Sequence, residues 1–321
     1  MSGAAETTAQ DGRDWVLPET RTAMPKAPKP AEMMHLAKRS DAEGLKRLAI
    51  HAALLLGAGA LIAWAPGWWK LPALLPMALV QAALFAPLHE TVHYTAFASR
   101  RLNAIVGWVA GAPSLWNWHL YQQFHMDHHK YTQIEGKDPE LAPPSPHELG
   151  GYIQRMFGLT FWKARLKHNW AGLKGDLSAY PYVHPAAAPR VSRSIRAMDA
   201  TLAVCAIGSA LIWGWQTPFL FWILPQLIGQ NMLRFYLITE HTGCSMDRNG
   251  LTNTRTTLTH PLVRLLMWNM PYHAEHHLYP FVPFHRLAEA HAVLKEKLAF
   301  VQPGYAAWHR DHLRRLRGGA A

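Results

Sequence analysis

Three short histidine clusters constrain this chain more than any other feature of its sequence. They read HETVH at residues 89–93, HMDHH at residues 125–129 and HAEHH at residues 273–277, and they hold eight histidines. Each cluster places imidazoles at positions i and i+4, which share one face of a helix about 5–6 Å apart at Cβ. Histidine is the commonest metal ligand among side chains, and one tetrahedral site uses about three or four protein ligands. Eight histidines therefore predict two metals.

The first cluster also matches the HExxH pattern of zinc proteases, in which two histidines bind zinc and a glutamate, here Glu90, is the general base. This pattern occurs in more than one class of metal enzyme. The other two clusters have the form HxxHH, which offers three ligands from little more than one helical turn. A membrane zinc protease therefore stays open as a distant alternative, but it leaves most of the histidines unexplained.

Four apolar segments predict an integral membrane protein. They cover residues 48–64, 71–88, 198–215 and 219–238, and each approaches the ~20 residues that cross a bilayer. Short links, APGWWK and QTP, join them as two hairpins, and Trp68 and Trp69 suit a membrane interface. We expect an all-α fold, a four-helix transmembrane bundle with a helical cytosolic cap that carries the histidine clusters.

The basic residues set the expected orientation. The formal net charge is +11, and the short links carry only Lys70. The lysines and arginines at the other ends of the apolar segments are Lys38, Arg39, Lys46, Arg47, Arg100, Arg101, Arg190, Arg193 and Arg196. The positive-inside rule then places both termini, the middle segment and all three clusters on the cytoplasmic side. No nucleic-acid-reading motif is recognisable, so membrane lipid is the expected partner of this charge.

The remaining sequence suggests three regions. Residues 1–45 lack an apolar period and are predicted to be a disordered cytoplasmic segment, residues 46–300 form the membrane domain, and residues 301–321 form a basic tail. Residues 103–118 are apolar but short, which favours an interfacial or re-entrant element. Cys205 and Cys244 form neither a disulfide framework nor a CxxC metal site.

Three further residues join the candidate site. His241 in ITEHTG ends the fourth apolar segment and is a ninth candidate ligand, and Glu240 beside it is a candidate to orient a ligand. Asp138 could hydrogen-bond a ligand imidazole or cap a turn before Pro139. The histidines without paired spacing are predicted to be structural or solvent-facing: His119, His147, His168, His184, His260, His285 and His291. Imidazole ligands suit several transition metals, and two adjacent sites that activate O2 favour iron over zinc.

The chain resembles members of the membrane fatty acid desaturase and hydroxylase superfamily over residues 48–298. The resemblance rests on the three histidine clusters, called histidine boxes in that family, in this order and among four apolar segments. This resemblance implies an integral-membrane non-haem enzyme with two iron ions that cycle between Fe2+ and Fe3+ and use O2 and two electrons. It also implies a bacterial inner membrane location and supporting roles for Glu90, Glu240 and Asp138. The ligands that it implies are His89, His93, His125, His128, His129, His241, His273, His276 and His277.

The resemblance indicates the reaction family better than the product. The stretches YTQIEGKDPEL and NMPYHAEHHLYPFVPFHRL are similar to bacterial fatty acid desaturases and hydrocarbon oxygenases, and carotenoid ketolases have similar second and third boxes. Desaturation of a long lipid or hydrocarbon chain taken from the bilayer is favoured, with hydroxylation as the alternative. No electron-carrier motif is recognisable, so a separate ferredoxin, rubredoxin or cytochrome with its reductase is expected.

A non-enzymatic metal-binding or transport protein is the third interpretation. Such a protein would place ionisable residues deep within its spans. The apolar segments hold few polar residues, chiefly Gln81, Gln226, Gln230, Asn231 and Arg234. Those of the fourth segment lie towards its cytoplasmic end, where they could serve an active site, so this interpretation is disfavoured.

Overall fold

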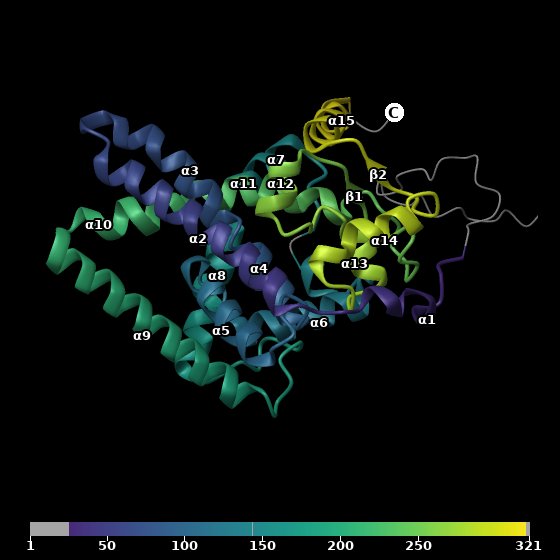
Figure 1. Ribbon diagram of the computed structural model, residues 1–321, viewed down its shortest axis with the longest axis horizontal. Helices are drawn as coiled ribbons and strands as arrows, with labels where there is room; N and C mark the ends of the chain where they lie inside the picture. The colour runs from purple at the N-terminus through teal and green to yellow at the C-terminus, as the bar shows by residue number, and fades with distance from the viewer. Residues whose placement is uncertain (1–25, 143, 319–321) are drawn as a thin grey trace, which may run out of the picture.

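A computed structural model describes residues 26–142 and 144–318. The described part of the chain is mainly helical, as expected, with two very short strands (Figure 1). In its N-terminal half the elements are α1 (Pro30–Met33), η1 (Met34–Leu36), α2 (Asp41–Trp64), η2 (Gly67–Trp69), α3 (Lys70–Ala82), α4 (Phe85–Val92), α5 (Arg100–Gly111), η3 (Ala112–Ser114), α6 (Trp118–Tyr131), η4 (Pro139–Leu141), α7 (Leu149–Met156) and α8 (Leu159–Lys174). In its C-terminal half they are α9 (Ala188–Trp213), α10 (Gln216–Pro218), η5 (Phe219–Ile223), α11 (Leu224–His241), β1 (Thr256–Thr257), α12 (Pro261–Leu266), α13 (His273–Leu278), η6 (Phe284–Arg286), α14 (Leu287–Leu294), β2 (Val301–Gln302) and α15 (Tyr305–Gly318).

Three helical stretches are long and apolar enough to cross a membrane: α2, the continuous stretch Gly67–Val92, and α9. Only 17% of the apolar window of α2 and 11% of that of α9 is buried inside the protein. An apolar helix that exposes most of its surface requires an apolar surrounding, which a bilayer provides. In Figure 1 these helices extend to the left, away from α13, α14 and α15.

The fourth apolar segment is helical, but α11 is not among the helices of the described chain that meet the length and apolarity expected of a span. Its first part is the π-helix η5, and α11 then packs along α3. Gln226 and Gln230 of α11 are buried, and Gln226 hydrogen-bonds Gln81 of α3. The polar residues that make α11 less apolar therefore face protein, while Leu227 and Phe235 remain exposed.

Helix α11 approaches α3 closely because Gly229 has no side chain. A Cβ atom at this position would collide with the backbone carbonyl oxygen of Ala78 and would meet the Ala82 side chain at 3.2 Å. Neither obstacle is the end of a flexible side chain, so the two helices would have to separate. This contact matters for the site, since α11 ends at His241.

A local sequence signal begins α6, the helix that carries the second histidine cluster. The Asn117 side chain accepts hydrogen bonds from the backbone N–H groups of His119 and Leu120, at 3.1 and 3.3 Å, and so caps α6. Helix α5 fills most of the segment predicted to be interfacial or re-entrant, and it packs against α4 and α6. The first two histidine clusters are thereby held on adjoining helices.

The N-terminal prediction is wrong for residues 26–45, which are ordered. Met33 and Leu36 are buried in a cluster with Tyr279 and Leu287 of the C-terminal part, because they present apolar side chains to it from α1 and η1. Residues 1–25 of the predicted disordered segment lie outside the described residues. Within the predicted tail, β2 pairs in parallel with β1 and residues 305–318 form α15.

We expect Gly229→Ala to lower the free energy of unfolding by about 1–3 kcal/mol, because the added methyl group forces α11 away from the Ala78 carbonyl. Gly208→Ala in α9 is the matched control, since a Cβ there meets nothing within 4 Å. That variant should be as stable as the parent or gain up to about 1 kcal/mol. Thermal unfolding in detergent compares the two, and equal stability would contradict the close packing.

Candidate metal centre

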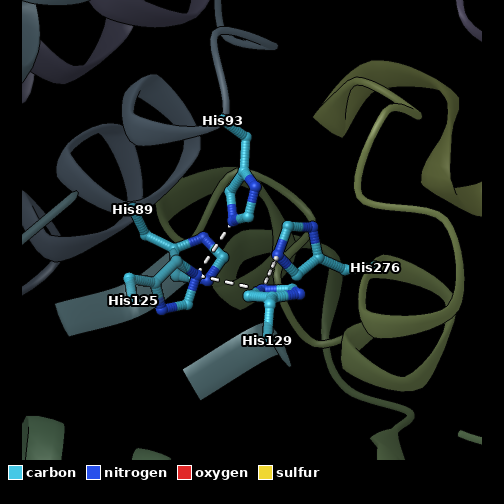
Figure 2. A group of neighbouring side chains, drawn as sticks. All are labelled: His89, His93, His125, His129 and His276. Carbon is cyan, nitrogen blue, oxygen red and sulfur yellow. Dashed lines mark hydrogen bonds between the residues drawn. The ribbon is translucent and has the colours of Figure 1, made fainter. Parts of the chain in front are cut away.

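Five histidines from three helices converge on one point. His89 lies in α4, His93 caps that helix at its C-terminal end, His125 and His129 lie in α6, and His276 lies in α13. One ring nitrogen from each lies within 4.8 Å of one from every other member (Figure 2). The Nε2 atoms of His125 and His93 are 2.9 Å apart, and those of His276 and His129 are 3.1 Å apart. This set is called the five-histidine group.

A second set lies beside it. Ring nitrogens of His128, His241 and His277 also lie within 4.8 Å of one another. The Nε2 atom of His273 is 3.2 Å from that of His241, so His273 adjoins this second set. The rings of His129 and His277 stack at 4.1 Å and join the two groups. All nine histidines predicted from the sequence are thus brought together, while their role as ligands stays a prediction.

The geometry fits metal ions. Nitrogens that bind one ion at about 2.0–2.1 Å lie roughly 3 Å from one another, close to the spacings in both groups. Both ring nitrogens of His89 are buried and find no hydrogen-bond partner among the residues that the structure describes. The same holds for Nε2 of His277. Buried lone pairs without a partner are costly, and a cation between them would remove that cost.

The electrostatics of the site keep most imidazoles neutral, which is the form that binds metal. Burial and the charge of His128 lower the pKa of His276 to about 3, and burial followed by the same neighbour lowers the pKa of His241 to about 3. His128 is the exception. Burial acts to lower its pKa, but the Glu140 and Asp138 carboxylates raise it above the ordinary value.

Asp138 performs both of the roles that the sequence left open. Its Oδ1 lies 2.9 Å from Nδ1 of His128, which leaves Nε2 of that ring directed towards the second group. The Asp138 carboxylate also accepts the backbone N–H groups of Gln133 and Glu140, at 2.8 and 2.9 Å, and so caps a turn. Glu240 is likewise close to a histidine, with Oε2 at 3.5 Å from Nε2 of His273.

Glu90 has a different place from the one that a zinc protease requires. Its carboxylate is fully buried and accepts the backbone N–H of Phe284 at 2.9 Å. This bond links the helix of the first cluster to the segment that follows the third. In the described chain its second oxygen has no hydrogen-bond partner, and no histidine ring is paired with it. A general base would have to face the reacting atoms.

The sequence did not predict the contacts of Glu140 and Glu275 with histidines, and it placed His291 outside the site. Oε2 of Glu140 lies 3.7 Å from Nε2 of His128. Glu275, inside the third cluster, is fully buried and hydrogen-bonds both Thr256 and Nδ1 of His291. His291 is therefore a structural partner of α13 rather than a solvent-facing residue. The presence of Glu275 within HAEHH could have indicated a supporting role, but its partners His291 and Thr256 lie 16 and 19 residues away along the chain.

A cavity of about 2180 Å³ opens beside the histidines. Trp116, Tyr121 and Phe161 line its apolar part, and His241 and Asp138 lie in its wall. Tyr121 stacks on His125, with ring centroids 5.2 Å apart, and so brings the cavity next to the five-histidine group. Long apolar molecules bind in concave sites that are lined in this way.

The sequence of this chain is similar to those of known proteins. The family model for fatty acid desaturases matches residues 66–309, which include all three clusters. An sn-1 oleoyl-lipid 12-desaturase from Picosynechococcus sp. is 23% identical over 274 residues, which cover 78% of this chain and 76% of the relative. A dihydrorhizobitoxine desaturase from Bradyrhizobium elkanii is 26% identical over 263 residues, or 74% of this chain and 70% of the relative. A sphingolipid delta(4)-desaturase DES1-like protein from Arabidopsis thaliana is 24% identical over 207 residues, 64% of this chain and 57% of the length of that relative.

The matched residues run from the link before the second apolar segment into α15 and so contain the whole histidine site. This extent, together with the convergence of the three clusters, identifies the chain as a member of the fatty acid desaturase family and as an oxidoreductase of that type.

Proposed function

We propose that this protein is a membrane diiron enzyme that desaturates a fatty acyl chain or a related long apolar chain. The observation that carries the proposal is the pairing of the five-histidine group with the adjoining group around His128, His241 and His277. Each group has enough nitrogens for one metal ion. The ligands proposed for two irons are these eight residues and His273, which adjoins His241.

The proposed architecture is a four-helix transmembrane bundle with a cytosolic cap. In it η5 and α11 form the fourth membrane element beside α2, α3 and α9, which is supported by the packing of α11 along α3. The basic residues at the histidine-bearing ends of these helices favour a cytoplasmic active site and cytoplasmic termini. We propose the bacterial inner membrane as the location.

The irons would supply the oxidising chemistry: O2, two electrons and two protons, together with two hydrogens from adjacent carbons, give a double bond and two molecules of water. The residues of the chain hold the histidine rings in place. Asp138 holds the ring of His128, Glu240 lies against His273, and Glu275 with His291 fixes the turn between His273 and His276. Trp116 and Tyr121 exclude water from the part of the cavity next to the site.

Electrons would come from a separate ferredoxin, rubredoxin or cytochrome with its reductase. The basic residues at the histidine-bearing ends of the apolar helices would attract an acidic carrier. Hydroxylation of a hydrocarbon, lipid or carotenoid on the same centre is the alternative, because it uses the same oxidant and places one oxygen atom in the product.

The lipid profile of cells with and without the chain tests the reaction. Desaturation predicts products that lack two hydrogens relative to their precursors, and hydroxylation predicts products that gain one oxygen atom. Mass spectrometry of extracted lipids distinguishes the two outcomes. Identical profiles, in cells that supply iron, O2 and an electron carrier, would contradict both reactions.

We expect His128→Ala and His276→Ala to abolish turnover and to lower the iron content of the purified protein, because each removes a nitrogen from one of the two groups. His147→Ala is the control, since His147 is exposed and belongs to neither group. Iron analysis and activity after reconstitution with iron measure the effect. Iron loss in the His147 variant, or full iron in the other two, would refute the ligand assignment.

We expect Glu90→Ala to keep its metal and part of its activity. The change leaves the Phe284 N–H without its acceptor, which costs about 1–3 kcal/mol of stability. A zinc protease would instead lose its general base and all activity while its metal stayed bound. Metal content, thermal unfolding and turnover of the variant separate the two mechanisms.

A further inference from the structure

Two guanidinium groups lie in the wall of the cavity beside the histidine site. Arg165 comes from α8 and is only 4% exposed, and Arg234 comes from α11. The Arg165 guanidinium lies over the ring of Trp116, 3.1 Å from its centroid, and that of Arg234 lies over the ring of Phe161 at 4.4 Å. Aromatic faces attract cations but do not saturate their hydrogen bonds.

The charge of Arg165 is not balanced by a carboxylate. Its Nε and Nη1 atoms are buried and have no hydrogen-bond partner among the described residues. The ionisable groups that act on it are Tyr121, Tyr180, Tyr182 and the second cation, Arg234. Burial lowers its pKa to about 9, so it remains charged at neutral pH. An uncompensated buried charge is costly unless a ligand of opposite sign completes the site.

Arg234 is held by a line of amides inside the helix pair α3 and α11. Its Nη2 donates to Gln230 at 3.2 Å, Gln230 donates to Gln226 at 3.3 Å, and Gln226 donates to Gln81 at 3.1 Å. Gln81 in turn donates to the Phe221 carbonyl in η5. This line engages Nη2 of Arg234, whereas its Nε is buried and has no hydrogen-bond partner in the described chain. Glu140 and Glu240 are the acidic groups that act on Arg234, but each also lies against a histidine of the site.

Only two aromatic rings separate Arg165 from the five-histidine group. Trp116, under the guanidinium, packs on Tyr121 with ring centroids 4.8 Å apart. The Tyr121 hydroxyl lies 3.5 Å from Nδ1 of His125. A molecule whose polar end meets the two arginines can therefore extend along these rings to the site of oxidation.

We infer that Arg165 and Arg234 bind the anionic end of the substrate, a carboxylate or a phosphate, inside this cavity. The inference rests on the proposed function, because it takes the bound molecule to be the one oxidised at the histidines. Guanidinium groups match both anions with paired hydrogen bonds. The position of the reacting carbons is then set by their distance from the acidic end. A plain hydrocarbon would leave Nε and Nη1 of Arg165 and Nε of Arg234 without a partner, so this site favours an acidic amphiphile.

Equilibrium binding to the full chain in neutral detergent tests the inference without O2 or an electron donor. The probes are oleic acid, oleoyl lysophosphatidic acid and methyl oleate. The parent should bind at least one anionic probe about 10–100-fold more tightly than methyl oleate. A preference for oleic acid assigns a carboxylate, and a preference for the lysophosphatidic acid assigns a phosphate. Equal affinity for all three probes would overturn the inference.

Arg165→Gln should abolish the preference for the anionic probe while binding of methyl oleate and iron content stay unchanged, and Arg165→Lys should retain part of it. Arg314→Gln is the matched control, because Arg314 lies in the outer wall of the same cavity but is 74% exposed. If Arg165→Gln fails to fold, Arg234→Gln decides by the same comparison. A preference that survives in the folded Arg165 or Arg234 variant, or that disappears equally in Arg314→Gln, refutes the site.

The binding assay and the lipid profile can fail separately. Retained charge preference with unaltered lipids would refute the proposed reaction and leave the anion site standing. New lipid products with equal binding of charged and uncharged probes would support the reaction and refute the anion site.

Discussion

The rest of the structure depends on one constraint: the ring nitrogens of buried imidazoles need hydrogen-bond or metal partners. Nine of them meet where α4, α6, α11 and α13 converge, and most have lowered pKa values that keep them neutral. Neutral rings that face one another with spacings near 3 Å are stabilised by a cation between them. The metal ions proposed for this site would therefore help to hold these four helices together, as well as supply the chemistry.

The surrounding residues hold each ring in a defined orientation. The Asp138 carboxylate contacts the ring of His128 and also accepts a backbone N–H of its own turn, so the orientation of this ring is fixed to the backbone. Glu275 does the same for α13 through Thr256 and His291. Such contacts hold the rings in place and would lower the entropic cost of assembling the proposed metal centre.

The cavity connects the histidine site to two arginines. Its apolar rings lead to the histidines, while Arg165 and Arg234 place positive charge within the same wall. The line of amides in α3 and α11 explains why α11 is less apolar than the other long helices: its polar side chains face α3 and Arg234 instead of lipid. The composition of this helix thus reflects its contacts within the protein.

The sequence by itself determined which histidines of each cluster share a helical face, because i, i+3 and i+4 spacing places them there, and it determined the long apolar helices through their length and composition. Only the tertiary structure decided how the nine rings divide between two groups, since that depends on how helices distant in sequence cross. It also decided the burial of Met33 and Leu36, the pairing of Glu275 with His291 and the isolation of Arg165. These depend on contacts between residues far apart along the chain, for which no local spacing provides a signal.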